Sequence, residues 1–323
     1  MLQIHSLWSI VREVNLVEMR AEIEQAARII VVGAPGSERD GMVRLLRGET
    51  DSFGAIVEAD FPTSRLQIPP VGPSDVFVVV GRPEGPTAEE RAGYRLILDT
   101  EVPAILAITG RGIGSAGGTT SGSLHEFVAV LDVDLDEPEN ALEELAHALV
   151  GLPDGTGLAL ARRAPALRDT IANRLIRDTS IANAQFALLS SLPAWVPLLG
   201  TLAGSAADVL ILTKNQLLLV FKLAGIYGRD LQHWRPLLLE MIPVIGGALV
   251  WRTVARNLVG LLPTPVSAVP KTAIAFVGTM TVGELAGRYY RDGLPIDPAG
   301  LQEIQERALQ RLHLPSPTRD DSE

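Results

Sequence analysis

The sequence contains no cysteine, and it contains no lysine before position 214. The absence of cysteine excludes a disulfide scaffold, a thiolate zinc site and cysteine catalysis. Because Lys214, Lys222 and Lys271 are the only lysines, any chemistry that needs a lysine in the first two hundred residues is also excluded. Aromatic residues make up only 5% of the 323 residues, yet 47% are hydrophobic and the mean hydropathy is +0.23. That value is unusual for a soluble enzyme, so the position of the apolar residues matters most.

The charge is divided unequally along the chain. Residues 1–156 carry 11 arginines and 25 acidic residues, a net charge of −14, whereas residues 157–323 carry 17 basic and 13 acidic residues, a net charge of +4. This asymmetry and a length above 300 residues predict two domains that face different partners. The acidic total of −10 argues against nucleic acid as a partner, since a nucleic-acid binder needs a basic surface.

The first 28 residues predict an amphipathic helix. Apolar residues recur at helical spacing, whereas a secretory signal would have a basic start followed by a clean apolar run. From residue 29 to 156, short β-branched runs alternate with helical segments. Strands are expected at 29–33, 76–80, 102–109 and 127–133, with helices around 87–100 and 138–149. This alternation predicts a three-layer α/β domain around a mainly parallel sheet.

The turn between the first strand and the following helix carries the clearest motif. Residues 33–40 read Gly-Ala-Pro-Gly-Ser-Glu-Arg-Asp, against the P-loop template G-x-x-x-x-G-K-[ST]. The segment resembles the small GTPases of the Era/Ras-like class, whose loops often read GxPGSGKS before a leucine-rich helix. The resemblance implies a Ras-like fold and a phosphate loop at Gly33, Gly36, Ser37 and Arg39.

The chain departs from that family at each position that carries its chemistry. Glu38 replaces the second glycine, Arg39 replaces the phosphate-binding lysine, and Asp40 replaces the hydroxyl that binds magnesium. Two carboxylates at a helix N-terminus repel a triphosphate. The segment 68–75 holds no aspartate in the right place for Asp-x-x-Gly, and Thr109-Gly-Arg111-Gly stands where the guanine-reading Asn-Lys-x-Asp is expected. The sequence therefore predicts a pseudo-GTPase, not an enzyme, with no cofactor.

Two alternatives remain for this domain: weak or atypical GTP binding through the vestigial loop, and an unrelated α/β domain with a glycine turn. The fingerprint-like Gly112-Ile-Gly-Ser-Ala-Gly117 is interpreted as a loop, because a strand follows it where a dinucleotide site needs a helix. The five histidines are scattered without metal-ligand spacing, so no metal site is predicted.

The second module holds most of the hydrophobicity. After a basic helical stretch around 162–177, residues 179–207 contain no charged side chain across 29 positions, but prolines and glycines interrupt them. A broken or re-entrant helical hairpin fits better than one straight span. Further apolar runs at 209–228, 236–262 and 264–287 each contain charges, which makes them poor independent spans. We expect a helical, membrane-associated domain at 157–294, followed by a C-terminal helix and disordered tail at 295–323.

Residues 180–292 resemble the uncharacterised, GTPase-associated domain of bacterial YcjF-type membrane proteins. The matching segments include NAQFALLSSLPAWVPLLG, ADVLILTKNQLLLVFKLAGIYGRDL and IPVIGGALVWRTVARNLVGLL. The resemblance implies membrane association and a GTPase-like neighbour domain, and we expect a location at the bacterial inner membrane, peripheral or integral. The basic stretch at 162–177 would then lie on the cytoplasmic side, with the N-terminal domain in the cytoplasm. Asp208, Lys214, Asn215 and Gln216 are predicted to form a buried polar cluster that either binds a partner or links helices by hydrogen bonds.

Three functions compete on this evidence. The first is a membrane-associated, non-catalytic scaffold or regulatory protein, whose pseudo-GTPase domain recruits a protein partner such as a true GTPase. The second is an atypical GTP-binding switch that is coupled to the helical membrane domain. The third is a soluble helical module that oligomerises through its apolar faces.

Overall fold

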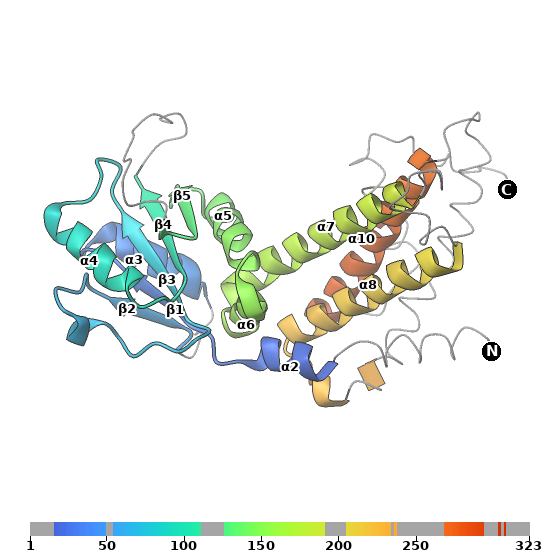
Figure 1. The fold of residues 1–323 in the computed structure, drawn as a ribbon, viewed down its shortest axis with the longest axis horizontal. Helices are drawn as coiled ribbons and strands as arrows, with labels where there is room; N and C mark the ends of the chain where they lie inside the picture. The colour runs from blue at the N-terminus through green and yellow to red at the C-terminus, as the bar shows by residue number, and fades with distance from the viewer. Residues whose placement is uncertain are drawn as a thin grey trace. The chain divides into compact units, whose positions relative to one another are not determined.

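The computed structural model describes residues 16–49, 54–110, 126–190, 205–233, 236–237, 268–293, 303–304 and 307. The chain forms two compact units, which are described separately (Figure 1). One comprises residues Glu18–Arg174, and the other comprises Met1–Val17 together with Leu175–Glu323. The division falls inside one long helix, α7 (Pro165–Leu189), whereas the sequence placed it after residue 156.

The first unit is built on five parallel strands in the order β2-β1-β3-β4-β5. The strands are β1 (Ile29–Val32), β2 (Ile56–Ala59), β3 (Val76–Gly81), β4 (Ala104–Thr109) and β5 (Ala129–Val133). Every residue of β1 and β3 is buried, which agrees with the continuous apolar runs that predicted them. The α/β class and the mainly parallel sheet are therefore confirmed, and the short strand β2 was not expected.

Helices cover both faces of this sheet. Helix α4 (Ala88–Leu98) packs through Tyr94 and Ile97 on a core that includes Phe77, Val79 and Leu106. Helices α3 (Ser37–Arg47) and α5 (Pro138–Val150) contact each other and lie against β1 and β5. The connection from β2 to β3 contains the short 3-10 helix η1 (Arg65–Gln67). The result is a three-layer arrangement in which the carboxyl ends of all strands share one edge.

A helical extension follows α5 within the same unit. It begins with the turn η3 (Pro153–Gly155) and continues through α6 (Thr156–Arg163) into the start of α7. Gly157 lies so close to α5 that an added Cβ would stand 2.4 Å from the Leu149 carbonyl oxygen. This close packing holds α6 against the α/β unit, which explains why the structural boundary lies beyond residue 156.

The second unit is formed by helices. It contains residues 175–189 of α7, helix α8 (Ser205–Ile226), the 3-10 turn η4 (Leu231–His233) and α10 (Ala268–Asp292). Helix α2 (Leu16–Glu24) begins in this unit, but its residues from Glu18 onward belong to the α/β unit. Helices α7, α8 and α10 lie side by side in Figure 1. Gly283 of α10 sits against Ile176 of α7 and Leu219 of α8, where an added Cβ would lie 2.7 Å from Ile176 Cγ2. The absence of a side chain at Gly283 thus allows the three helices to pack closely at this point.

Within the described parts of the chain, no helix is both long enough and apolar enough to cross a membrane. Residues 191–204 of the hairpin predicted within 179–207, most of the run 236–262 and most of the C-terminal tail lie outside the described residues. Residues 179–189 of that stretch continue helix α7.

Candidate functional site

The candidate site lies at the carboxyl edge of the sheet, where the order of the strands reverses. Strand β1 pairs with β2 on one side and with β3 on the other. The chain therefore leaves β1 in one direction, forms β2, and returns to the opposite side of β1 to form β3. In open α/β sheets ligands bind beyond the carboxyl ends of strands at such a reversal. The predicted phosphate loop begins here, directly after Val32.

Each of the two loop glycines has a structural reason. Gly33 is buried, and an added Cβ would lie 3.2 Å from Val80 Cβ and 3.3 Å from Arg39 Cβ, so no side chain fits without displacing a neighbour. Gly36 has a φ of 150°, a conformation that L side chains rarely adopt. The motif-like glycine spacing thus follows from packing and backbone conformation alone. Ser37 begins α3, but its side chain lies outside the described residues.

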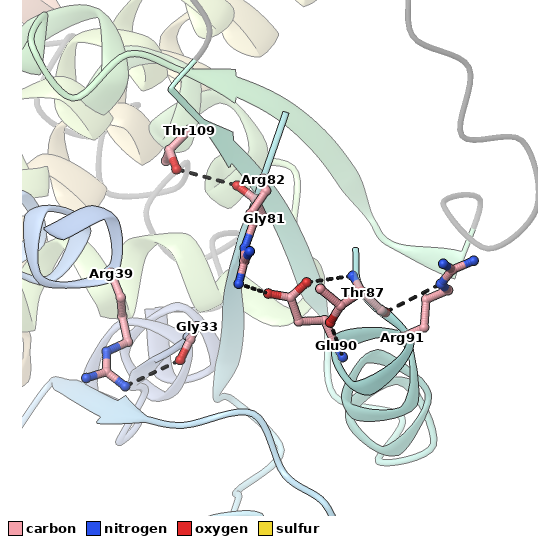
Figure 2. Close-up of polar contacts among 8 residues, drawn as sticks. All are labelled: Gly33, Arg39, Gly81, Arg82, Thr87, Glu90, Arg91 and Thr109. Carbon is pink, nitrogen blue, oxygen red and sulfur yellow. Dashed lines mark hydrogen bonds and ion pairs between the residues drawn. The ribbon is translucent and has the colours of Figure 1, made fainter. Parts of the chain in front are cut away.

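Arg39 turns back from α3 toward the end of β2. Its side chain is only 10% exposed, and its guanidinium contacts Glu58 in β2 and Asp60, which directly follows that strand. Arg39 Nη2 lies 2.7 Å from Glu58 Oε1, and Nη1 donates to Asp60 Oδ1. Nη1 also donates to the carbonyl oxygen of Gly33 at 3.3 Å, which is the contact drawn in Figure 2. The fork of the guanidinium is therefore directed at the protein's own acceptors.

The surroundings of Arg39 are strongly acidic. Besides Glu58 and Asp60, Asp40 Oδ1 lies 3.7 Å from Arg39 Nε, and Glu38 is exposed in the same first turn of α3. Arg39 thus lies within ion-pair distance of three carboxylates, and Glu38 adds a fourth acidic residue in the same helical turn. Acidic residues in a first turn interact favourably with the helix dipole, so Glu38 and Asp40 occupy the electrostatic position that a bound phosphate would take.

Glu58 and Asp60 are the residues that sequence reasoning missed. Strand β2 spans only four residues, and a single one of them, Ile56, is buried. An apolar-run search therefore passes over it. The signal that was present is the acidic residue placed directly after a short strand, a position that reaches the carboxyl edge of a parallel sheet.

Asp75, in the segment examined for Asp-x-x-Gly, lies at the opposite edge. It precedes β3 and is 1% exposed, and its carboxylate pairs with Arg28, which precedes β1. Arg28 Nη2 lies 2.5 Å from Asp75 Oδ2, and this hydrogen bond raises the pKa of Arg28. Asp75 therefore links the amino ends of two strands and takes no part in the candidate site.

A hydrogen bond joins the carboxyl ends of β3 and β4. The Thr109 hydroxyl donates to the Gly81 carbonyl oxygen at 3.4 Å, so the residue at the predicted guanine-reading position is buried and used within the fold (Figure 2). Thr87 and Glu90 form a capping box at the start of α4, and Arg82 Nη2 lies 3.0 Å from Glu90 Oε1. Residues 111–117, which include the fingerprint-like segment, lie outside the described residues.

Tyr94 of α4 packs in the core of the α/β unit and reaches the end of β3. Its ring packs on Phe61 and, edge to face, on Phe127, and its hydroxyl approaches Gly81. Burial raises the pKa of Tyr94 to about 12, with a further increase from the nearby Glu90 carboxylate. Because an ordinary tyrosine is already neutral at physiological pH, the raised pKa changes the protonation state of Tyr94 only in strongly alkaline solution.

The second unit contains a separate polar network. Asn215 Nδ2 on α8 donates to Asn183 Oδ1 on α7 at 2.7 Å, and Asn183 Nδ2 donates to Thr279 Oγ1 on α10 at 2.9 Å. Gln216 Nε2 donates to the same hydroxyl oxygen at 3.2 Å. Asn183 and Thr279 are fully buried. Neutral side chains from three helices therefore satisfy one another in an apolar core.

This network brings together two of the four residues that the sequence grouped. Asn215 and Gln216 belong to it, and Asn183 and Thr279 join them from distant segments that the sequence did not single out. Lys214 is half-buried on the same helix. Asp208 lies six residues before Lys214 in α8, and its side chain lies outside the described residues. Among the described residues no group of three acidic or histidine side chains is arranged to hold a metal ion.

Comparison with protein-family models, with curated proteins and with solved structures finds no match to this chain.

Proposed function

We propose that the chain is a membrane-associated, non-catalytic scaffold or regulatory protein. In this proposal the α/β unit is a degenerate Ras-like P-loop domain, a pseudo-GTPase, and the helical unit is a YcjF-type module at the bacterial inner membrane. The observation that carries the proposal is the engagement of Arg39 by Glu58, Asp60 and the Gly33 carbonyl group.

A nucleotide phosphate at this loop would meet two obstacles. To bind the phosphate, Arg39 would have to leave Glu58 and Asp60, which would lose their ion-pair partner. The Gly33 carbonyl oxygen would lose a hydrogen-bond donor at the same time. The phosphate would also meet the carboxylates of Glu38 and Asp40 at the start of α3. Like charges at a helix N-terminus remove the attraction that a phosphate loop needs.

Asp60 supports the Ras-like part of the proposal. It follows β2, the strand beside β1, and in P-loop proteins an aspartate helps to hold Mg²⁺ together with the loop hydroxyl. Here the hydroxyl position is Asp40, and the guanidinium of Arg39 contacts Asp60. We infer that Arg39 supplies the positive charge that a metal ion supplies in the active relatives.

Membrane association rests on the character of the helical half of the chain. The 29 uncharged positions at 179–207 and the apolar runs beyond residue 208 are joined to a basic stretch around 162–177. A basic segment beside apolar segments favours the anionic, cytoplasmic side of a membrane. The acidic α/β unit would then face the cytoplasm and recruit a protein partner, for which a true GTPase is the expected type.

The nucleotide part is tested by titrating the full chain with fluorescent GTP and GDP in the presence of Mg²⁺. We expect no saturable binding, and we expect the variant Glu38→Gly/Arg39→Lys/Asp40→Ser to gain affinity because it restores the loop chemistry. Micromolar binding by the wild-type chain that is lost in Gly33→Val would contradict the proposal and support the GTP-binding switch.

The membrane part is tested by flotation of the full chain with vesicles that contain anionic lipid, before and after a carbonate wash. We expect co-flotation with the vesicles, weakened by salt if the basic stretch contributes. Recovery of the whole protein as a stable soluble monomer would contradict membrane association, and recovery as a soluble oligomer would favour the oligomerisation module.

A further inference from the structure

Two arginines of α4 lie on its exposed side without an acidic partner. Arg91 and Arg95 are four residues apart, so they occupy one face of the helix, and both side chains are exposed. Arg91 Nε donates to the Thr87 carbonyl oxygen at 3.4 Å (Figure 2), but within the described residues no carboxylate pairs with either guanidinium. Like charges at this spacing repel each other, so the pair weakens α4 in the isolated chain.

This arginine row differs from its surroundings. Five other arginines of the α/β unit are each matched with a carboxylate: Arg20, Arg28, Arg39, Arg65 and Arg82. Carboxylates are abundant, since residues 1–156 contain 25 acidic residues against 11 arginines. A basic row that stays unmatched in so acidic a unit is therefore available to a group outside the chain's own fold.

Helix α5 carries the opposite charge at the same spacing. Glu139 and Glu143 are four residues apart and exposed, and no basic group of the described residues pairs with them. Asp136 and Glu144, close by in the sequence, are exposed as well. This acidic row also consists of like charges, so α5 is weakened by the same kind of repulsion as α4, with the opposite sign.

The two rows cannot meet within one chain. Helix α4 packs through Tyr94 and Ile97 on one face of the sheet, whereas α5 lies with α3 on the other face. Each row is directed away from the sheet, because the other side of each helix is buried, at Ile97 in α4 and at Leu145 in α5. A contact between the rows therefore needs two copies of the chain, and it joins different surfaces of those copies, which is a heterologous interface.

An exposed leucine borders the arginine row. Leu66 of η1 is 98% exposed, and Arg65 Nη2 beside it lies 3.1 Å from Asp99 Oδ2 at the end of α4. The backbone nitrogen and the hydroxyl of Thr63 donate to Gln67 Oε1 at 2.7 and 2.8 Å, which fixes the turn. Polar contacts on both sides thus hold Leu66 in solvent, where a second molecule that covers it would gain apolar area.

We propose that the α/β unit self-associates head to tail, with Arg91 and Arg95 of one copy facing Glu139 and Glu143 of the next. Rows of equal spacing bring each guanidinium to a carboxylate and relieve the repulsion within both helices. Each terminal copy keeps one unused row, so the contact can repeat along a series of copies. The inference depends on neither nucleotide binding nor membrane association.

The contact is expected to be weak and reversible, because a single pair of helices covers little surface. The acidity of the whole unit opposes it only slightly at physiological salt, where exposed charges more than about 8 Å apart are screened. The paired charges themselves lie closer than that distance. Raising the salt to about 1 M should therefore weaken the association.

Charge reversal in the full chain tests the proposal. Self-association is measured by sedimentation velocity over a range of concentrations, in a mild nonionic detergent and about 0.15 M salt. We expect Arg91→Glu/Arg95→Glu to raise the dissociation constant at least about tenfold, because attractive pairs become repulsive. Glu139→Arg/Glu143→Arg should have the same effect. Unchanged circular dichroism shows that the variants are folded.

The mixture of the two reversed variants and a control complete the test. The rows of the two variants are complementary, so their equimolar mixture should associate more tightly than either variant alone. Arg44→Glu/Arg47→Glu reverses two exposed arginines of α3 and changes the net charge as much as the arginine reversal on α4, but it should leave the dissociation constant nearly unchanged.

Three results would each overturn the proposal: no self-association of the wild-type chain, equal weakening by the α3 control, and no recovery in the mixture. Self-association that none of the reversals alters would also overturn it, and would favour oligomerisation through the apolar helical unit.

Discussion

The two units satisfy their buried polar groups in different ways. In the α/β unit a charged group, Arg39, is held at the sheet edge by Glu58 and Asp60, whose side chains remain 37% and 71% exposed. In the helical unit Asn183 and Thr279 are fully buried, and only neutral amides and hydroxyls meet there. Charges are tolerated where water reaches one partner, whereas a core packed on all sides favours neutral hydrogen bonds, since desolvating an ion costs more than desolvating an amide.

The largest expected effect comes from adding a charge to the neutral network. Asn183→Asp keeps the shape of the side chain, but it buries a carboxylate and removes the donor to Thr279. We expect a loss of at least about 3 kcal/mol in unfolding free energy, measured in urea. The loss should grow as pH rises from acidic to neutral, because burial disfavours the ionised form. Asn173→Asp, an exposed site on the same helix, is the matched control. Equal effects at both sites would show that the core tolerates charge.

The next largest effect concerns the close contact beside that network. In Gly283→Ala the new Cβ would lie 2.7 Å from Ile176 Cγ2 and 2.8 Å from Ile176 Cγ1. We expect a destabilisation of about 2 kcal/mol from overpacking. Adding Ile176→Ala should recover part of it, because that change removes both clashing atoms. A double-mutant cycle measures the coupling, and strict additivity would argue against direct contact.

A smaller effect is expected from removing the charge at the sheet edge. Arg39→Ala leaves two carboxylates and the Gly33 carbonyl oxygen without their donor, but water can reach the carboxylates. We expect a loss of about 1 to 2 kcal/mol, which decreases as salt screens the remaining acidic groups. Arg39→Lys should recover little of it, because an ammonium group cannot match the fork. A loss of unfolding free energy as large as that of Asn183→Asp would contradict the idea that a charge costs less at the sheet edge than in the helical core.

The smallest effect at neutral pH concerns Tyr94. Its folded pKa of about 12 lies above the ordinary value of 10.0, so the neutral phenol favours the folded state. The associated stability is fully present below the ordinary pKa and is lost as pH rises through the folded pKa. Tyrosinate absorbance of the wild-type chain minus that of Tyr94→Phe should therefore show a late transition. A transition near the ordinary value would mean that the ring is solvated.

Local pattern predicted much of the α/β unit. The buried runs at β1 and β3 and the helices α4 and α5 follow from continuous apolar residues and helical spacing, which depend on near neighbours alone. Strand β2 escaped prediction because its four residues are mostly outside the core. The role of Asn183 could not be predicted, because the local sequence around a single asparagine in a helix does not distinguish a side chain exposed to water from one that is hydrogen-bonded in the core. Its role depends on Thr279, which is 96 residues away.

The sequence by itself determined which chemistry is missing: there is no thiol anywhere, and the loop has no glycine at position 38, no lysine at position 39 and no hydroxyl at position 40. Those statements need no coordinates, because a side chain that is absent cannot act. Only the tertiary structure decided what Arg39 does instead, since its partners come from another strand and meet it only where parallel strands end at one edge. In the same way, only helix packing brought Asn183, Asn215 and Thr279 together, because the free energy of a buried hydrogen bond depends on partners that local sequence cannot specify.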